Sequence, residues 1–382
     1  MFKAATTGFA WQVTSLAIAG GGDRGEVAIA GKAGRNASLW PVMTKSPGHR
    51  GPPTSYDVAQ RAGVSQSAVS RCFKPGASVA PKTRVRIVAA AQELGYQPNA
   101  IAQGLITRRS NLVAVLISNL TNLYYPEVLA ELTRRLDERG IRVLLFTLQA
   151  ESDIDKVLDQ VWRYRVDGVI AAARMLPAQV MAFRQRGVPL VLYNRIGEGA
   201  PVSSICCDSV TGENDLVERL VGADHKLFGI ITGPADSYVS QERVRAAEAR
   251  LQQFGHAPVI VEGAFDYDSG EKGLRQLMAM TDGKLDALIC ANDLMAIGAI
   301  DTAREAFGLG VPEQLSVVGF DGVGPASWAS YRLTTIRQPV RRMTEAAVVM
   351  LVERVEDPEL PPERRLFAGE LIEGRSARLG TR

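Results

Sequence analysis

Residues 54–73 carry two short amphipathic helical segments joined by a tight turn, and this pattern restricts the possible folds of the N-terminal part strongly. Val58 and Ala62 belong to one apolar face, and Gly63 permits a sharp turn. Ser65 stands where the next helix needs an N-terminal cap. Two helices and a turn within about twenty residues have the spacing of a helix-turn-helix.

The second of these helices, expected over 66–73, presents polar side chains that can contact base edges and phosphates of DNA. Residues 54–110 hold eight Lys or Arg against two acidic residues, a net charge of +6. A small helical bundle with a polar face would explain the periodicity but not this charge, so the segment predicts DNA binding. Because one helix-turn-helix binds a half-site, we expect a homodimer on a palindromic operator. The polar side chains are Gln66, Ser67, Ser70 and Arg71; Gln66, Ser67 and Arg71 are expected in the major groove, and Arg71 is best suited to guanine.

Charge is distributed unevenly along the 382 residues, whose net charge is +3. Residues 1–53 carry +4, so the part after residue 110 carries −7. A basic end on an acidic body indicates a nucleic-acid module joined to a domain that does not itself bind DNA. No apolar run approaches the ~20 residues of a membrane helix, so no membrane association is expected. The cysteines form no CxxC pair and are expected to be reduced thiols of a cytosolic protein, with no metal and no cofactor: Cys72, Cys206, Cys207 and Cys290.

Residues 1–53 differ from the rest of the chain in being rich in Gly and Ala. The apolar run 11–19 is short and lacks a convincing cleavage site, so we do not expect secretion. We expect either a disordered extension or a start codon assigned too far upstream, with Met43 near the natural start.

From residue 111 onward, short β-branched apolar runs alternate with segments of helical period. This alternation predicts two parallel α/β lobes of four to five strands each. Ligands of such sheets bind at the carboxyl ends of strands, so two such edges would face each other across a cleft. The expected strands are 113–118, 143–148, 168–173, 189–194, 228–233, 258–263, 287–292 and 316–321, and the expected helices are 126–140, 153–166, 177–187, 241–254, 269–280 and 294–307.

Polar and aromatic residues gather at the predicted strand ends, where a ligand would bind. Asp and Asn at such places also cap the following helix, and Asp208 and Asp293 could do only that. An aromatic ring together with carboxylate, amide and guanidinium groups suits a sugar, and Arg195 could also attract a carboxylate. The candidate effector-binding residues are Tyr124, Tyr125, Asn194, Arg195, Asp208, Arg243, Asn292, Asp321 and Gln338.

Three motifs resemble the LacI/GalR family, the lac repressor type of bacterial transcription regulators. They are YDVAQRAGVSQSAVSR (56–71), VAPKTRVRI (79–87) and LGYQPNAIAQGL (94–105), and the resemblance continues to about residue 380. It implies a helix-turn-helix headpiece and a periplasmic-binding-protein-like body of two parallel α/β lobes.

The resemblance also assigns roles to individual residues. It implies an effector held by Arg243, Asn292, Asp321 and Gln338. The family pattern matches less closely at three further contact residues, Asp208, Tyr124 and Tyr125. For DNA it implies phosphate contacts by Tyr56, Ser70, Thr83 and Asn99, and a hinge helix over 99–107 that inserts Ala102 and Leu105 into the minor groove.

These observations predict a transcription regulator, and a repressor in preference to an activator. Its operator affinity would be controlled by a small polar effector, a sugar or sugar derivative, that binds between the two lobes. A sugar-binding protein of a transport system would share the lobes, but the basic headpiece and the missing signal peptide count against it. An enzyme is not expected and no catalytic residue is assigned, because GxSxG, P-loop and HExxH motifs are absent. The expected domains are the extension 1–53, the headpiece 54–98, a hinge helix and linker 99–110, and the bilobed effector-binding and dimerisation domain 111–380.

Overall fold

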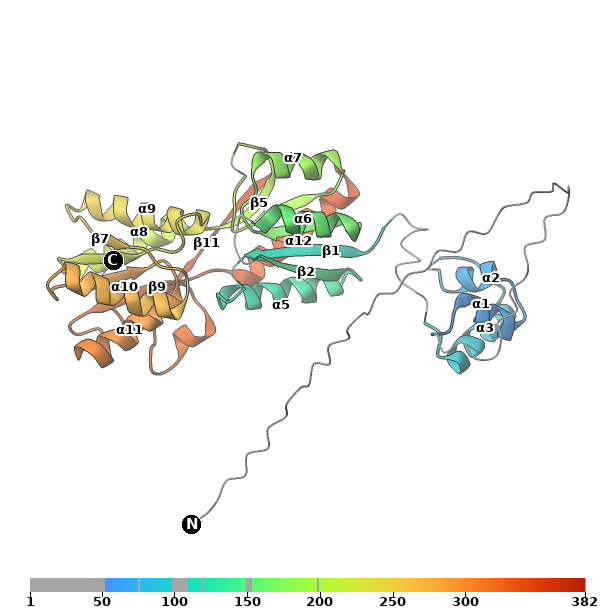
Figure 1. Ribbon diagram of the computed structural model, residues 1–382, viewed down its shortest axis with the longest axis horizontal. Coiled ribbons are helices and arrows are strands. Elements are labelled where there is room, and N and C mark those ends of the chain that lie inside the picture. Colours follow the sequence, from blue (N-terminus) through green and yellow to red (C-terminus); the bar gives the residue numbers. More distant parts are fainter. Residues whose placement is uncertain are drawn as a thin grey trace, which may run out of the picture.

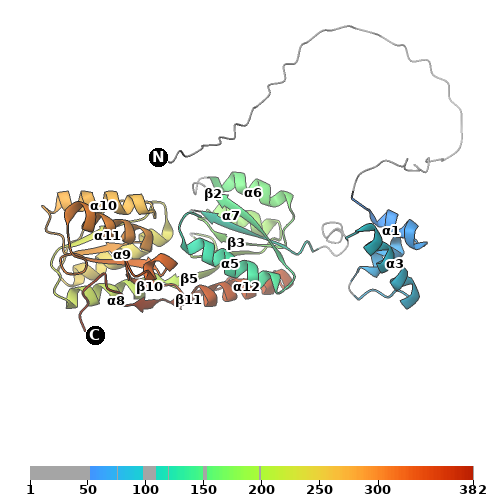
Figure 2. The same ribbon diagram turned by 90° about the horizontal axis from the view of Figure 1, so that it is seen from below.

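The computed structural model describes residues 52–74, 76–97, 109–118, 120–148, 153–197 and 199–381. They form a three-helix headpiece and a body of two α/β lobes (Figure 1, Figure 2). Residues 1–51 of the extension and the hinge helix expected over 99–107 lie outside the described residues. No helix of the described part is long and apolar enough to cross a membrane.

The headpiece has the helix-turn-helix geometry that its sequence predicts. Thr54 caps the first helix, and Ser65 caps the second by accepting a hydrogen bond from the backbone N–H three residues on. Gly63 ends the first helix at φ +61°, the left-handed conformation that the turn requires. The second helix ends one residue before the expected Phe73, which becomes its C-terminal cap. The helices are α1 (Ser55–Ala62), α2 (Gln66–Cys72) and α3 (Pro81–Leu94).

The first lobe contains a six-stranded sheet in the order β11-β5-β4-β3-β1-β2, with all strands parallel. Along β1, alternate side chains enter different apolar cores, so helices must cover both faces of the sheet. Helices α5 and α12 cover one face, and α6 and α7 the other. The strands are β1 (Leu112–Ser118), β2 (Arg142–Leu148), β3 (Gly168–Ala172), β4 (Leu190–Tyr193), β5 (Ser203–Asp208) and β11 (Arg364–Ala368); the helices are α5 (Tyr124–Asp137), α6 (Ile154–Arg163), α7 (Pro177–Gln185) and α12 (Val340–Glu356).

The second lobe repeats this plan with the strand order β12-β10-β9-β8-β6-β7. Only β12 runs antiparallel to its neighbour among the described strands. Helices α10 and α11 cover one face and α8 and α9 the other. The strands are β6 (Phe228–Ile231), β7 (Val259–Val261), β8 (Ala287–Cys290), β9 (Ser316–Asp321), β10 (Thr334–Arg337) and β12 (Glu370–Ile372); the helices are α8 (Ser209–Gly222), α9 (Tyr238–Gln253), α10 (Tyr267–Met280), α11 (Asp293–Phe307) and the 3-10 turn η2 (Gly324–Ser327).

The chain passes between the lobes three times, after β5, after β10 and between β11 and β12. The sequence predicts four to five strands per lobe, whereas each sheet has six, because the eight expected strands omit β5 and β11 of the first lobe and β10 and β12 of the second. Figure 1 shows the red C-terminal helix α12 within the first lobe, beside the early helix α5.

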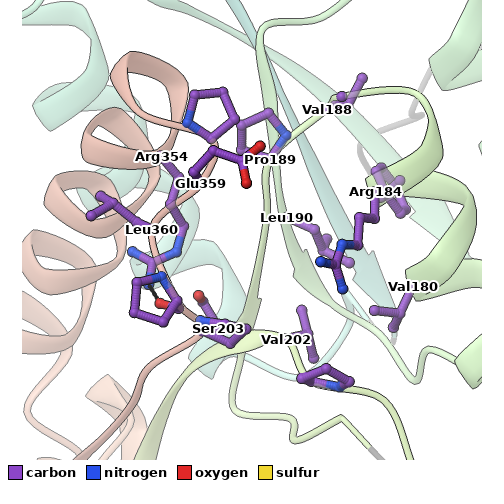
Figure 3. A pocket seen from close by; sticks show the side chains of 16 residues that line it. Val180, Arg184, Val188, Pro189, Leu190, Val202, Ser203, Arg354, Glu359 and Leu360 are labelled. Carbon is purple, nitrogen blue, oxygen red and sulfur yellow. Dashed lines mark hydrogen bonds between the residues drawn. The ribbon is translucent and has the colours of Figure 1, made fainter.

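The two ends of the first sheet differ in what they border. The carboxyl ends of its strands point toward the second lobe, and Asn194 follows β4 there. The amino ends of β4 and β5 border a surface cavity of about 340 Å³ (Figure 3).

Candidate functional site

The candidate DNA-binding face is formed by α2 and the residues around it. Ser67 and Arg71 are exposed on α2, and Tyr56 on α1 has 72% of its surface exposed. Gln66, Ser70 and Thr83 are partly buried, and the Gln66 amide donates to Ser55 Oγ at 3.3 Å. The candidates Asn99, Ala102 and Leu105 lie outside the described residues.

Two of the headpiece arginines hold its helices together. Arg84 donates to the carbonyl of Cys72 at 3.0 Å, which fixes the end of α2 against α3. Arg86 donates to the carbonyls of Ala62 and Gly63, which fixes the turn of the helix-turn-helix. The charge of these residues therefore also serves structure, while Arg71 stays exposed on α2.

In the body, polar side chains of the two lobes meet in one hydrogen-bonded group, here called the inter-lobe cluster: Tyr124, Asn194, Arg243, Asp321 and Gln338. The Asn194 amide of the first lobe donates to Gln338 Oε1 of the second at 2.8 Å. Gln338 Nε2 donates to Asp321 Oδ1 at 2.7 Å, and Arg243 Nη2 donates to the same oxygen at 2.8 Å. All five side chains are at most 4% exposed. The structure thus brings together five of the nine effector-binding candidates.

Arg243 lies at the base of this cluster. Its Nη1 donates to the carbonyl of Ala291 at 2.6 Å, and its guanidinium carbon lies 3.7 Å from the centre of the Phe320 ring. Its Nε is buried and has no hydrogen-bond partner among the described residues. The carboxylate of Asp321 compensates the buried charge, so the two residues form an ion pair closed off from solvent.

Backbone conformation at two of the strand ends is unusual. Asp321 has φ +119° and Asn194 has φ +50°, although neither is glycine. Asn tolerates the left-handed conformation, whereas a non-glycine residue at φ +119° is strained and is maintained only by its surroundings. Such strain gathers at ligand and switch sites, which strengthens the candidacy of Asp321.

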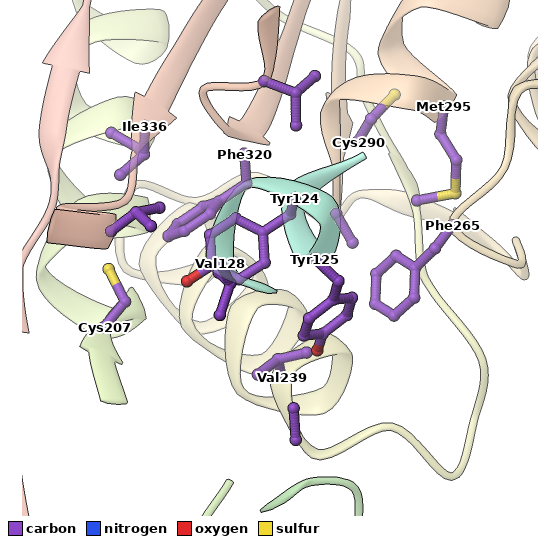
Figure 4. Packing of buried hydrophobic residues seen from close by; sticks show 14 of the residues in the cluster. Tyr124, Tyr125, Val128, Cys207, Val239, Phe265, Cys290, Met295, Phe320 and Ile336 are labelled. Atoms are coloured by element: carbon purple, nitrogen blue, oxygen red, sulfur yellow. The ribbon is translucent and has the colours of Figure 1, made fainter. Parts of the chain in front are cut away.

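Two tyrosines at the start of α5 provide the aromatic part of the site. Tyr124 Oη accepts from the Asn194 amide at 3.2 Å and lies 3.2 Å from Tyr193 Oη. Tyr125 Oη accepts from Arg195 Nη1 at 3.2 Å. Figure 4 shows both rings beside apolar side chains of the second lobe, including Phe320. Burial raises the pKa of the Tyr124 hydroxyl well above its ordinary value, so this group is a neutral donor and acceptor.

Asp208 and Asn292, two further candidates, serve as helix caps in this structure. Asp208 caps α8 and accepts from Thr211 Oγ1 at 2.8 Å. Asn292 caps α11, and its amide donates to the carbonyl of Phe265 at 2.9 Å. The capping alternative therefore applies to Asp208. It fails for Asp293, whose carboxylate instead accepts from Val323 N and Thr335 Oγ1.

Sequence reasoning missed two polar residues beside the cluster. Asn122 is 6% exposed, and its amide lies 3.5 Å from Asp321 Oδ2 across the lobes. It follows β1 two residues before Tyr124, so the same strand-end rule could have selected it. Glu213 on α8 is 1% exposed with an unbonded Oε2, and burial raises its pKa to about 8, against the opposing effect of the Arg243 charge. No sequence signal marked Glu213, because it lies within a helix.

The described residues contain no group of three or more His, Cys, Asp or Glu side chains placed to hold a metal ion. All four cysteines are buried free thiols, and burial raises the pKa of Cys206 and Cys207 to about 12.

Two family profiles match this chain. One, described as bacterial regulatory proteins of the lacI family, covers residues 54–99, and the other, a periplasmic binding protein-like domain, covers residues 217–377. Among curated proteins, the HTH-type transcriptional repressor PurR of Aliivibrio salmonicida (strain LFI1238) is 31% identical over 324 residues, 82% of this chain and 95% of that protein. The repressor CytR of Escherichia coli (strain K12) is 28% identical over 324 residues, 84% of this chain and 94% of that protein.

Solved structures give the same result. The lac repressor dimer bound to operator and the anti-inducer ONPF superposes with a TM-score of 0.77 at 28% identity, covering 85% of this chain and 99% of that one. The complex of the transcriptional regulator CelR with cellobiose gives a TM-score of 0.65 at 29% identity, covering 85% of this chain and 100% of that one.

Proposed function

This chain belongs to the LacI family of bacterial regulatory proteins. We propose that it is a repressor and that a small polar ligand, bound in the inter-lobe cluster, controls its affinity for operator DNA. It is a DNA-binding transcription regulator and not an enzyme. The proposal assigns DNA binding to the headpiece, 54–98, coupling to the hinge segment, 99–110, and ligand binding and dimerisation to the body, 111–380.

On DNA, α2 enters the major groove of each half-site. Ser67 and Arg71 are exposed on this helix and can reach base edges, with Gln66 beside them at its start. The remaining DNA-binding candidates contact phosphates or the minor groove in this proposal: Tyr56, Ser70, Thr83, Asn99, Ala102 and Leu105.

A palindromic operator requires a second copy of the chain. We propose that this copy packs against the edge strands of the two sheets. In each sheet, the strand at the end opposite the crossing segments is an edge: β2 in the first lobe and β7 in the second. Leu145 on β2 and Ile260 on β7 are 40% and 36% exposed. Apolar side chains on open edge strands need cover, and a homodimer interface would supply it.

The observation that carries the ligand proposal is the hydrogen bond between Asn194 and Gln338, with Asp321 behind it. The amide groups of Asn194 and Gln338 can form this hydrogen bond with each other only while the two lobes are close. A ligand with several hydroxyls could replace these bonds, because amide and carboxylate groups pair with hydroxyls in two directions. The rings of Tyr124 and Tyr125 offer an apolar face beside them, which suits the C–H side of a sugar.

A sugar or sugar derivative is therefore the proposed ligand class, with Asp208, Arg195 and Asn292 at the margin of the site. The cellobiose complex of CelR supports this class, since that regulator has the same fold and similar sequence. Arg195 contacts Tyr125 and Ser118, so it could orient a sugar acid from the first lobe.

Two assays test the proposal. Gel shifts with palindromic and random DNA of equal length test operator binding, and a thermal-shift screen of sugars and sugar acids, cellobiose among them, tests the ligand class. Gln338→Ala should weaken binding of the selected sugar about tenfold or more, because the variant removes one buried amide that pairs across the lobes. Gln276→Ala, an exposed position on α10, is the matched control and should bind normally. Equal binding by both variants would contradict the inter-lobe location.

A further inference from the structure

The cavity at the amino ends of β4 and β5 lies at the opposite edge of the first sheet from the inter-lobe cluster. Its walls are α7, the amino ends of these two strands, and the segment 358–362 between α12 and β11 (Figure 3). Its volume of about 340 Å³ lies within the size range of small-molecule sites. The inter-lobe ligand cannot occupy it, because Asn194 and Asp208 mark the other ends of the same strands.

Most of the lining is apolar and rigid. Val180, Leu190, Val202 and Leu360 line the cavity together with several prolines. Prolines lose little conformational entropy when a ligand packs on them, so the wall is already formed before binding. This part of the cavity suits the hydrocarbon portion of a ligand.

A buried positive charge forms part of the wall. Arg354 on α12 is 8% exposed and donates to two neutral carbonyls, Pro361 O at 2.8 Å and Met350 O at 3.2 Å. No carboxylate within the described part of the chain forms an ion pair with it. Burial lowers the pKa of Arg354, and the charges of Glu363 and Glu353 oppose this effect only in part.

A second guanidinium stands on the facing wall. Arg184 of α7 lines the cavity opposite Arg354, and its side chain is exposed, so it is able to move over an occupant (Figure 3). Glu359 at the exposed rim supplies the acidic group among the lining residues. Two cations against one carboxylate leave a net charge of +1 in the cavity.

We infer that this cavity is a second binding site, which takes a small organic monoanion with an apolar body, such as an aromatic or short aliphatic carboxylate. The carboxylate of the ligand pairs with Arg184 and neutralises the charge that Arg354 places in the wall. The apolar body packs on Val202, Leu190 and the prolines. The segment 358–362 leads into the amino end of β11, the strand that precedes the crossing at Gly369, so an occupant contacts the start of that strand.

Benzoate is the probe that tests this site, with benzyl alcohol as its neutral counterpart. In the full-length protein, methyl NMR should show saturable benzoate-dependent shifts at Val188, Val202 and Leu360. Benzyl alcohol should bind about tenfold more weakly or worse, because it lacks the charge. Arg184→Gln should weaken benzoate binding about tenfold. Operator binding in the gel shift should stay normal, because Arg184 is an exposed residue of α7 in the body and not part of the headpiece.

Arg275→Gln on α10 is the matched control, because Arg275 is an exposed arginine of the second lobe. It should leave benzoate binding unchanged. Leu360→Glu adds a negative charge at the rim and should also weaken benzoate binding. The proposal is overturned if benzoate gives no saturable shifts at these methyl groups, if benzyl alcohol binds equally well, or if Arg184→Gln and Arg275→Gln behave alike. Failure here would leave operator binding and the inter-lobe ligand untouched, because those are measured on other residues.

Discussion

Arg243 is 3% exposed and places its charge between the Asp321 carboxylate and the ring of Phe320. Removing one member of a buried pair leaves the other without compensation and typically costs about 3–5 kcal/mol. Arg243→Ala would therefore disturb folding as well as ligand binding. This is why Gln338, a neutral residue of the same cluster, is the better position for testing the ligand.

The buried carboxyl group of Glu213 makes the stability of the fold depend on pH. Its carboxyl has a pKa near 4.5 in the unfolded chain and about 8 when buried in α8. Below pH 4.5 both states are protonated and the contribution to stability is fully present. As the pH rises toward 8, the unfolded chain releases the proton first, so stability falls and the contribution is lost above the folded pKa. Glu213→Gln, which stays neutral, should therefore raise the unfolding temperature at about pH 9 by several degrees and much less at about pH 5.

Thermal unfolding at the two pH values measures this effect. Glu305→Gln is the control, because Glu305 is exposed on α11. A gain at high pH that Glu305→Gln also shows would mean that net charge, and not the burial of Glu213, determines the effect.

Arg71 is expected to contribute directly to the affinity for the operator and to its sequence preference. It is exposed on α2, and a bidentate contact to guanine is worth about 1–3 kcal/mol of discrimination. Arg71→Ala should weaken operator binding by about that amount and relax the preference at one base pair per half-site. Competition gel shifts against operators changed at single positions measure it. An equal loss on operator and on random DNA would instead identify a phosphate contact.

The polar residues at strand ends predicted which side chains would lie close together between the lobes. Asp321 ends β9, Asn194 and Gln338 directly follow β4 and β10, and the structure brings the three side chains into hydrogen-bond contact. Helix capping competes for the same residue types, and local sequence cannot separate a cap such as Asn292 from a side chain that faces the other lobe. Glu213 was invisible for a different reason, since its burial depends on how α8 packs against the sheet.

Among the elements, the expected strands and helices were largely predictable, whereas the return of α12, β11 and β12 to the two lobes was not. Apolar runs identify buried strands locally, so eight expected strands occur near their predicted places. The membership of α12 in the first lobe depends on its long-range packing against α5, which no local pattern encodes. The same is true of β11 and β12, which are short, partly exposed edge strands with weak apolar signals.

Gly369 is the single residue between β11 and β12, where the chain crosses between the lobes. A Cβ at this position would lie 2.6 Å from Ile336 Cγ2 and 3.3 Å from the carbonyl of Arg337. Gly369→Ala should therefore destabilise the body by about 1–3 kcal/mol, because the packed neighbours must shift. Gly324→Ala is the control, since nothing lies within 4 Å of its added Cβ. Denaturant unfolding measures the free energy of unfolding of both variants. Equal values would show that the crossing segment accommodates a methyl group without loss of stability.

At the scale of the whole molecule, one apolar core extends through both lobes. It includes Tyr124 and Leu132 of α5 as well as Phe320 and Leu277 of the second lobe. Such a core resists continuous deformation and favours discrete arrangements. Lobes joined by three crossing segments would therefore move as bodies, and the first lobe continues through residue 109 into the segment that leads to the headpiece.

If the inter-lobe ligand controls operator binding through this movement, the two affinities are linked in both directions. A ligand that changes operator affinity by some factor must have its own affinity changed by operator DNA by the same factor, commonly about 5–150-fold. Calorimetric titration of the sugar selected in the thermal-shift screen, with and without saturating operator, should therefore give two dissociation constants whose ratio equals the change in operator affinity. The direction of the ratio distinguishes an inducer from a corepressor. Arg275→Gln should keep the ratio, because Arg275 belongs to neither site. Equal sugar affinity with and without operator would show that the inter-lobe cluster binds its ligand without controlling the headpiece.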